Sequence, residues 1–123
     1  MSQTLILVVD DSRVARMMTR AAIVKLHPDW DIIEAASGED ALTTIALDRP
    51  DFVLMDVNMP GIGGLETARQ LRQRCPKARI SLLTANIQAP IRHQAEEMGV
   101  GFMSKPLSED ALSQFLSGGA ASP

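Results

Sequence analysis

Two stretches decide the fold of this chain: residues 5–11 read LILVVDD, and residues 52–56 read FVLMD. In each stretch an uninterrupted apolar run is followed directly by aspartate. Continuous apolar runs of this length are typical of strands that are buried on both faces of a sheet. Two such strands that each end in acid predict that Asp10, Asp11 and Asp56 meet at one edge of that sheet.

Three further apolar runs follow at residues 32–36, 80–83 and 100–103. Segments of helical period lie between successive runs and after the last one. Strict alternation of strands and helices predicts a parallel sheet with right-handed crossovers and helices on both faces. The expected fold class is therefore α/β, with ligands bound outside the carboxyl ends of the strands.

Capping residues and helix breakers predict where the helices begin and end. Five helices are expected. The first begins after Ser12, and the second begins at Ser37 and ends before Pro50. The other three run from about Leu65 to Cys75, from Pro90 to Gly99, and onward from Ser108. The first helix is expected to be amphipathic. One face carries Val14, Met17, Met18 and Ala21, with the methionines as core fillers, and a second, solvated face carries Arg13, Arg16 and Arg20.

Length and charge narrow the class of protein. A chain of 123 residues is one domain of common size, and a formal net charge of −3 argues against direct contact with nucleic acid. No apolar stretch approaches the roughly 20 residues of a membrane span, so no membrane insertion is expected. Cys75 has no second cysteine to pair with, which predicts a reducing, cytoplasmic setting.

Three crowded carboxylates need a cation, because two like charges about 4 Å apart repel by roughly 4 kcal/mol at an effective dielectric constant near 20. Mg²⁺ prefers carboxylate oxygens and keeps positions open for phosphate oxygens. The cluster therefore predicts a metal-assisted phosphate site with Asp56 as candidate nucleophile. For each aspartate taken alone, capping of a helix or turn is the simpler interpretation. No G-x-G-x-x-G pattern is present, so a dinucleotide cofactor is not expected.

Two further polar residues follow strand runs at the same predicted edge. Lys105 comes after the last run and could place its ammonium on a phosphoryl oxygen. Thr84 comes after the fourth run and could offer a hydroxyl donor to the same group, although a lone threonine there is more often a cap.

These positions together form a pattern that resembles the receiver domain of two-component response regulators, of the stand-alone chemotaxis type, over residues 5–115. The motifs that carry the resemblance are Asp10-Asp11, Asp56, Met59-Pro60, Thr84-Ala85 and Lys105-Pro106, in this order. The resemblance implies a flavodoxin-like (βα)5 fold with strand order 2-1-3-4-5. It places the domain at residues 1–116 and leaves 117–123 as a flexible tail or truncated linker.

The resemblance also implies a function, which is the Mg²⁺-dependent transfer of a phosphoryl group to Asp56 from a histidine kinase or phosphotransfer protein. Asp11, Asp56 and the backbone carbonyl of Asn58 would ligate Mg²⁺, and Asp10 would act through water. Such a domain is a signalling module rather than an enzyme, although it assists its own phosphorylation and dephosphorylation.

The switching residues are carried over in the same way. Lys105 would pair with the phosphoryl group, Thr84 would hydrogen-bond it, and Phe102 matches the aromatic switch position. A downstream protein would bind the face made by the fourth helix, fifth strand and fifth helix, and a phosphorylation-dependent homodimer is compatible with the resemblance. One departure is Gly63-Gly64, where the family usually has Asp-Gly, so capping of the third helix is in question.

Two other functions remain open at this point. A haloacid-dehalogenase-like phosphohydrolase also uses a nucleophilic aspartate after a strand, but it needs a second acid two residues on, where this chain has Asn58. A pseudo-receiver binds partners without phosphorylation, and its expected signature is the loss of site residues, none of which is missing here.

Overall fold

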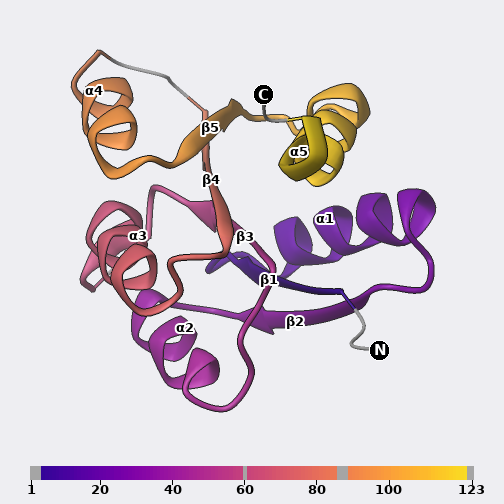
Figure 1. Cartoon of the computed structure of the whole chain (residues 1–123), viewed down its shortest axis with the longest axis horizontal. Helices are drawn as coiled ribbons and strands as arrows, with labels where there is room; N and C mark the ends of the chain where they lie inside the picture. The colour runs from indigo at the N-terminus through magenta and orange to yellow at the C-terminus, as the bar shows by residue number, and fades with distance from the viewer. Residues whose placement is uncertain (1–3, 60, 86–88, 122–123) are drawn as a thin grey trace.

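The fold is given by a computed structural model that describes residues 4–59, 61–85 and 89–121, the last four of these by their backbone alone. Pro60 of the Met59-Pro60 motif lies outside the described residues. Strands and helices alternate along the chain (Figure 1). The elements are β1 (Leu5–Val9), α1 (Arg13–Leu26), β2 (Asp31–Ala35), α2 (Gly38–Ile45), β3 (Phe52–Asp56), α3 (Gly63–Arg74), β4 (Arg79–Thr84), α4 (Ala89–Met98), β5 (Gly101–Ser104) and α5 (Glu109–Ala121).

The five strands form one parallel sheet in the order β2-β1-β3-β4-β5. This confirms the predicted α/β class and the flavodoxin-like strand order. The strand order changes direction between β1 and β3. The helices that follow these two strands, α1 and α3, lie on opposite faces of the sheet, which leaves space beyond the carboxyl ends of the strands. No helix in the described part of the chain is long and apolar enough to cross a membrane.

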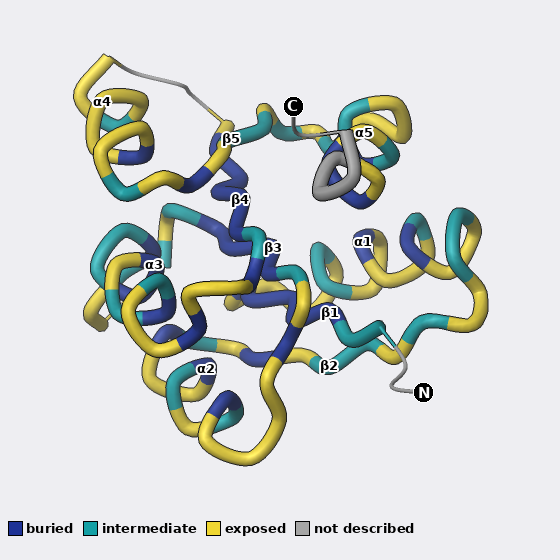
Figure 2. The backbone as a smooth tube through the Cα atoms, viewed as in Figure 1, coloured by how far each residue is buried: buried dark blue, intermediate teal, exposed yellow. Residues whose placement is uncertain are grey.

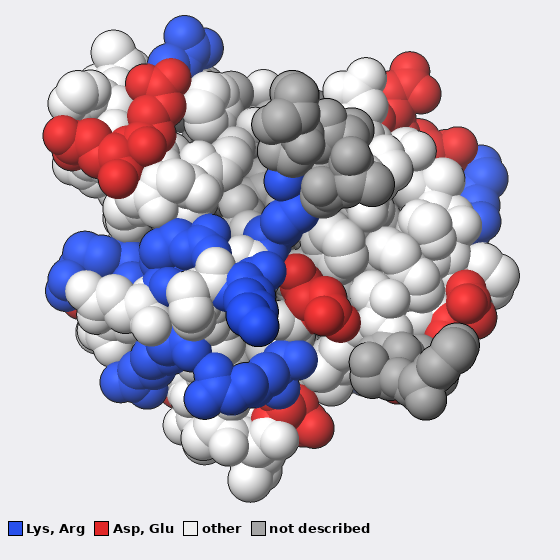
Figure 3. Space-filling model, in the orientation of Figure 1, with Lys and Arg blue, Asp and Glu red and all other residues white. Residues whose placement is uncertain are grey.

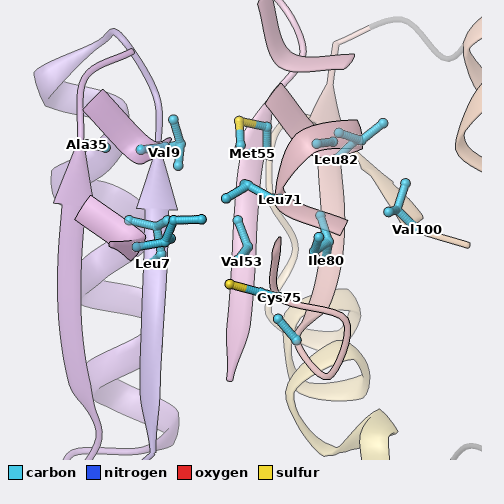
Figure 4. Packing of buried hydrophobic residues seen from close by; sticks show 14 of the residues in the cluster. Leu7, Val9, Ala35, Val53, Met55, Leu71, Cys75, Ile80, Leu82 and Val100 are labelled. Atoms are coloured by element: carbon cyan, nitrogen blue, oxygen red, sulfur yellow. The ribbon is translucent and has the colours of Figure 1, made fainter. Parts of the chain in front are cut away.

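Each face of the sheet is covered by its own set of helices (Figure 1). Burial is concentrated in the strands and in the inner sides of the helices (Figure 2). One apolar cluster lies beneath α2, α3 and α4 and includes Leu7, Val9, Val53, Met55, Leu71, Ile80, Leu82 and Ala95 (Figure 4). The other lies beneath α1 and α5 and includes Ile6, Val8, Ile23, Leu54, Leu112, Phe115 and Leu116. Because successive strand residues point to opposite faces, a strand with two buried faces needs the continuous apolar runs seen in the sequence.

The expected orientation of α1 was wrong. Val14 is 65% exposed and Met18 is 69% exposed, while Thr19 and Ile23 are buried. The helix carries apolar side chains on more than one side, so its period alone did not identify the face that packs on the sheet. The buried side is instead the one that brings Arg16 beside β2.

Two helix boundaries also differ from expectation. α3 begins at Gly63, two residues earlier than predicted, and Ile62 caps it without any side-chain hydrogen bond. The question raised by Gly63-Gly64 is therefore answered: α3 forms without a side-chain cap. α5 continues to Ala121, through five residues that the sequence analysis assigned to the tail.

Candidate functional site

The three aspartates meet where β1 and β3 end, side by side in the sheet. Asp10 follows β1, Asp11 opens the turn into α1, and Asp56 is the last residue of β3. One carboxylate oxygen from each residue lies within 4.8 Å of the others. Asp10 and Asp56 are buried, whereas Asp11 is exposed and leaves the cluster open to solvent on one side. A small set of converging carboxylates that is open to water suits a hard divalent cation.

Lys105 supplies a positive charge to this cluster from the end of β5. Its Nζ lies 3.2 Å from Oδ1 of Asp56 and 3.4 Å from Oδ2 of Asp10. Its backbone N–H donates to the carbonyl of Thr84 at 2.8 Å, which fixes the start of the β5–α5 connection. The next peptide bond, to Pro106, is cis. Lys105 therefore bridges two of the three acids.

The acids and the lysine change each other's proton affinity. Burial raises the pKa of Asp56 above its ordinary value, against a backbone hydrogen bond from Asn58 that lowers it, and the nearby charge of Asp10 raises it further. Burial acts to lower the pKa of Lys105, but the charges of Asp10 and Asp56 outweigh it, so this pKa is raised. Asp56 is thus a carboxylate whose charge is only partly compensated by its surroundings.

Backbone amides orient two of the carboxylates. The N–H of Ser12 donates to Oδ1 of Asp10 at 2.9 Å, and the N–H of Asn58 donates to Oδ1 of Asp56 at 3.2 Å. Each bond spans two residues, so each aspartate is held by the turn that follows it. The other oxygen of each carboxylate is not used by these bonds.

The start of α3 lies against the backbone of Asp56. The N–H of Gly64 donates to the carbonyl of Val57 at 3.3 Å, and a Cβ added at Gly64 would lie 2.3 Å from the carbonyl oxygen of Asp56. Only glycine permits this approach. The loop between β3 and α3 is held close to the acid cluster in this way.

The two predicted switch residues lie on adjacent strands. Thr84 is buried at the end of β4 and pairs with Ser104 of β5. Phe102 is half-buried in β5, packs against the cluster beneath α2, α3 and α4, and has the guanidinium carbon of Arg92 5.3 Å from its ring centroid.

Sequence reasoning missed Arg16. Its Nη1 donates to the backbone carbonyl of Asp10 at 2.6 Å, and its Nε donates to Glu34 of β2 at 3.0 Å. Its side chain is only 16% exposed. Arg16 therefore ties the turn that carries Asp10 to both α1 and β2. The spacing of Arg16 and Glu34 carries no recognisable signal, because their contact depends on which face of α1 packs inward.

The family model that describes the response regulator receiver domain matches residues 6–117. The chain belongs to this family. Among curated relatives of the receiver domain, the transcriptional activator ExaE of Pseudomonas putida is 38% identical over 101 residues, which cover 81% of this chain and 47% of ExaE. The cyclic di-GMP phosphodiesterase response regulator RpfG of Xanthomonas campestris is 41% identical over 106 residues, 83% of this chain and 28% of RpfG. The chain thus spans less than half the length of these relatives.

Solved structures agree with this assignment. Chemotaxis protein CheY4 of Vibrio cholerae superposes with a TM-score of 0.84 at 26% identity, over 94% of this chain and 98% of CheY4. As a receiver domain of response regulators, the chain is a signalling domain of two-component systems. Receiver domains interact with histidine kinases or phosphotransfer proteins and with downstream effectors, and they typically bind Mg²⁺ at an acidic pocket such as this one.

Proposed function

We propose that Asp56 accepts a phosphoryl group from a phosphohistidine of a histidine kinase or phosphotransfer protein. A carboxylate oxygen of Asp56 attacks phosphorus, the O–P bond forms, the N–P bond breaks, and the released imidazole takes up a proton. The observation that carries the proposal is the lysine that bridges two members of the acid cluster, with Nζ at 3.2 Å from Asp56 and 3.4 Å from Asp10. Such an arrangement presents a nucleophile and a phosphate-binding cation within one small site.

The residues of the cluster fit a Mg²⁺ ion. Asp11 and Asp56 would ligate it directly, the backbone carbonyl of Asn58 would be a third ligand, and Asp10 would act through water. The support is that one oxygen of each acid lies within 4.8 Å of the others and that Asp11 faces solvent. When bound, the ion would neutralise charge that builds up on the incoming phosphoryl group.

Lys105 and Thr84 would then hold the phosphorylated state. The ammonium of Lys105, which lies 3.2 Å from Asp56, would pair with a phosphoryl oxygen. Thr84 ends the strand next to β3, and its hydroxyl would hydrogen-bond a second phosphoryl oxygen. Phosphorylation adds close to two negative charges and strong acceptors, which supply the force for this rearrangement.

The surface that would respond is the face made by α4, β5 and α5. Phe102 lies in β5 and contacts Arg92 of α4, so inward movement of the ring would break that contact. Loss of the contact would change the shape and charge that α4 and β5 present to a downstream protein. The effect is a population shift between two arrangements of this face.

Intact-mass spectrometry tests the proposal. Wild-type protein incubated with a small phosphoryl donor and Mg²⁺ is expected to gain the mass of one phosphoryl group, and EDTA is expected to prevent the gain. Asp56→Asn, which preserves size and can still accept the Asn58 hydrogen bond, is expected to show no adduct. Asp48→Asn is a matched control, because Asp48 is exposed in the α2–β3 connection.

An adduct of equal amount on Asp56→Asn, or none on the wild type, would refute the proposal. Multiple turnover of phosphate esters would instead favour the phosphohydrolase alternative. A partner affinity that is the same in wild type and Asp56→Asn, with and without beryllofluoride, would favour the pseudo-receiver alternative.

A further inference from the structure

A second charged surface lies at the amino ends of β3 and β4, which is the opposite end of these strands from Asp56. Four cationic side chains come from the segments that lead into these strands and from the end of α3. We call this surface the basic edge, and its members are Arg49, Arg72, Arg74 and Lys77. In Figure 3, Lys and Arg side chains gather in the middle of the face shown, over the α3–β4 connection.

The basic edge holds most of the cationic side chains that form no salt bridge among the described residues; the others are Arg13, Arg79 and Arg92. Lysine and arginine side chains elsewhere mostly pair with acids: those paired are Arg16, Arg20, Lys25, Arg69 and Lys105. Within the described ranges, no member of the basic edge forms a salt bridge with a carboxylate. A chain with a net charge of −3 therefore keeps a concentrated positive field on one surface.

Local structure explains only part of this concentration. Nη1 of Arg49 donates to the carbonyl of Arg74 at 2.7 Å, and Arg72 donates to the carbonyl of Pro76. Both contacts stabilise the carboxyl end of α3, where cations also interact favourably with the helix dipole. Arg74 also lies in the last turn of α3, whereas the exposed charge of Lys77 lies beyond the helix and makes no such contribution.

The basic edge contains a hollow. Its volume is about 370 Å³, and its lining alternates between charge and apolar surface. Arg49 and Lys77 are the cations in the lining, and the apolar part is made by Pro50, Pro76 and Ala78. Asp51 also lines the hollow, but its carboxylate accepts the N–H of Leu5 at 2.9 Å and is held at one side. The hollow has room for one apolar side chain beside the exposed ammonium of Lys77.

We propose that the basic edge binds an acidic segment of a partner protein, with an apolar side chain in the hollow and carboxylates on Arg74 and Lys77. Nucleic acid fits less well, because the described lining residues of the hollow include no aromatic side chain on which bases could stack. The surface differs from the α4–β5–α5 face and does not depend on phosphorylation of Asp56.

The two sites can be occupied at the same time. β3 runs from Phe52 beside the basic edge to Asp56, and the four residue steps between them span about 13 Å. A partner could therefore hold the receiver domain at the basic edge while the carboxyl ends of the strands remain open to a phosphodonor. Asp56→Asn is expected to leave the affinity of the basic edge unchanged.

Fluorescence anisotropy with a labelled probe peptide tests the proposal on the full chain. The probe has the sequence GSEEDLDEEG, and a second probe has serine in place of its leucine. Wild-type protein is expected to bind the leucine peptide with a Kd below about 100 μM at low salt, and the serine peptide several-fold more weakly. Arg74→Glu with Lys77→Glu is expected to weaken binding at least tenfold, since both side chains are exposed and would pair with carboxylates of the peptide.

The matched control is Arg13→Glu with Arg92→Glu, which changes net charge equally at two cations outside the basic edge and is expected to change the Kd less than twofold. Equal loss in both double variants would overturn the proposal, because attraction would then depend on net charge alone. Equal affinity for the two peptides, tighter binding of a single-stranded RNA, or no binding at all would also overturn it. If a charge reversal impairs folding, Arg74→Gln with Lys77→Gln provides the same comparison.

Discussion

Asp56→Asn should stabilise the metal-free receiver domain, although it removes the proposed phosphoacceptor. The carboxylate of Asp56 is buried among charges of its own sign, with oxygens of Asp10 and Asp11 within 4.8 Å. Replacement by asparagine removes one charge and keeps an oxygen that can accept the N–H of Asn58. The variant therefore isolates the electrostatic cost of crowding the acids.

The expected size follows from the distances. At 4.8 Å, the upper limit for the three oxygens, two unit charges repel by about 3.5 kcal/mol at an effective dielectric constant near 20. Two such repulsions act on Asp56, and Lys105 at 3.2 Å offsets about 5 kcal/mol of them. Asp11 is exposed, so water screens its share. We expect Asp56→Asn to raise the free energy of unfolding by about 1 to 2 kcal/mol, or Tm by roughly 4 to 8 °C.

Urea and thermal unfolding in EDTA and in Mg²⁺ measure this effect. Mg²⁺ at 100 times its Kd should stabilise the wild type by about 2.7 kcal/mol and the variant by much less, so that the order of stability reverses. Asp48→Asn serves as the control for a generic change of charge. A loss of more than about 1 kcal/mol on Asp56→Asn in EDTA, or equal stabilisation of both proteins by Mg²⁺, would show that crowded acids are not the dominant feature of the site.

Four further predictions concern residues whose environments the structure defines. The pKa of Asp56 is raised in the folded state, so the folded protein holds this proton more tightly than the unfolded chain does. The ionised carboxylate therefore destabilises the fold above the folded pKa, and this destabilisation disappears as pH falls toward 3.8. In urea titrations at decreasing pH, the difference in the free energy of unfolding between wild type and Asp56→Asn should shrink accordingly. Arg16→Gln should lower the free energy of unfolding by about 1 to 3 kcal/mol, because the mostly buried guanidinium pairs with Glu34 and donates to the carbonyl of Asp10. Arg20→Gln removes a more exposed ion pair and should cost less than about 1 kcal/mol by the same assay. Met18→Ser should change stability by no more than about 0.5 kcal/mol, and a loss of 2 kcal/mol or more in chemical denaturation would contradict its exposed position. The fluorescence of Trp30 should not change when Mg²⁺ binds, since its ring stacks on His27 and Phe52 at the start of β3; quenching by Mg²⁺ in the wild type would mean that the metal site lies elsewhere or is coupled to this stack.

The acid cluster could be predicted from sequence because it depends on topology alone. In a parallel sheet every strand delivers the residue that follows it to the same edge, so Asp10, Asp56 and Lys105 were brought together by the alternation of strands and helices. The strand order came from the resemblance, and the structure confirmed it. The roles of Thr84 and Phe102 stay predictions, because they concern a state with a phosphoryl group bound.

Features that depend on how one element packs on another could not be predicted. α1 has apolar side chains around much of its circumference, so its period alone does not identify Ile23 rather than Met18 as the inward residue. That choice also decides whether Arg16 reaches Glu34 and the carbonyl of Asp10. The continuation of α5 to Ala121 was missed because Gly118 and Gly119 disfavour a helix interior, yet the helix continues through them.

The close approach of Gly64 to the carbonyl of Asp56 has a mechanical consequence. Helix α3 and Asp56 touch through backbone atoms, which cannot rotate away as side chains do. A displacement of the amino end of α3 would be transmitted through these atoms to Asp56, the proposed phosphoacceptor. A protein that binds at this end of the helix would therefore change how readily Asp56 gains or loses a phosphoryl group.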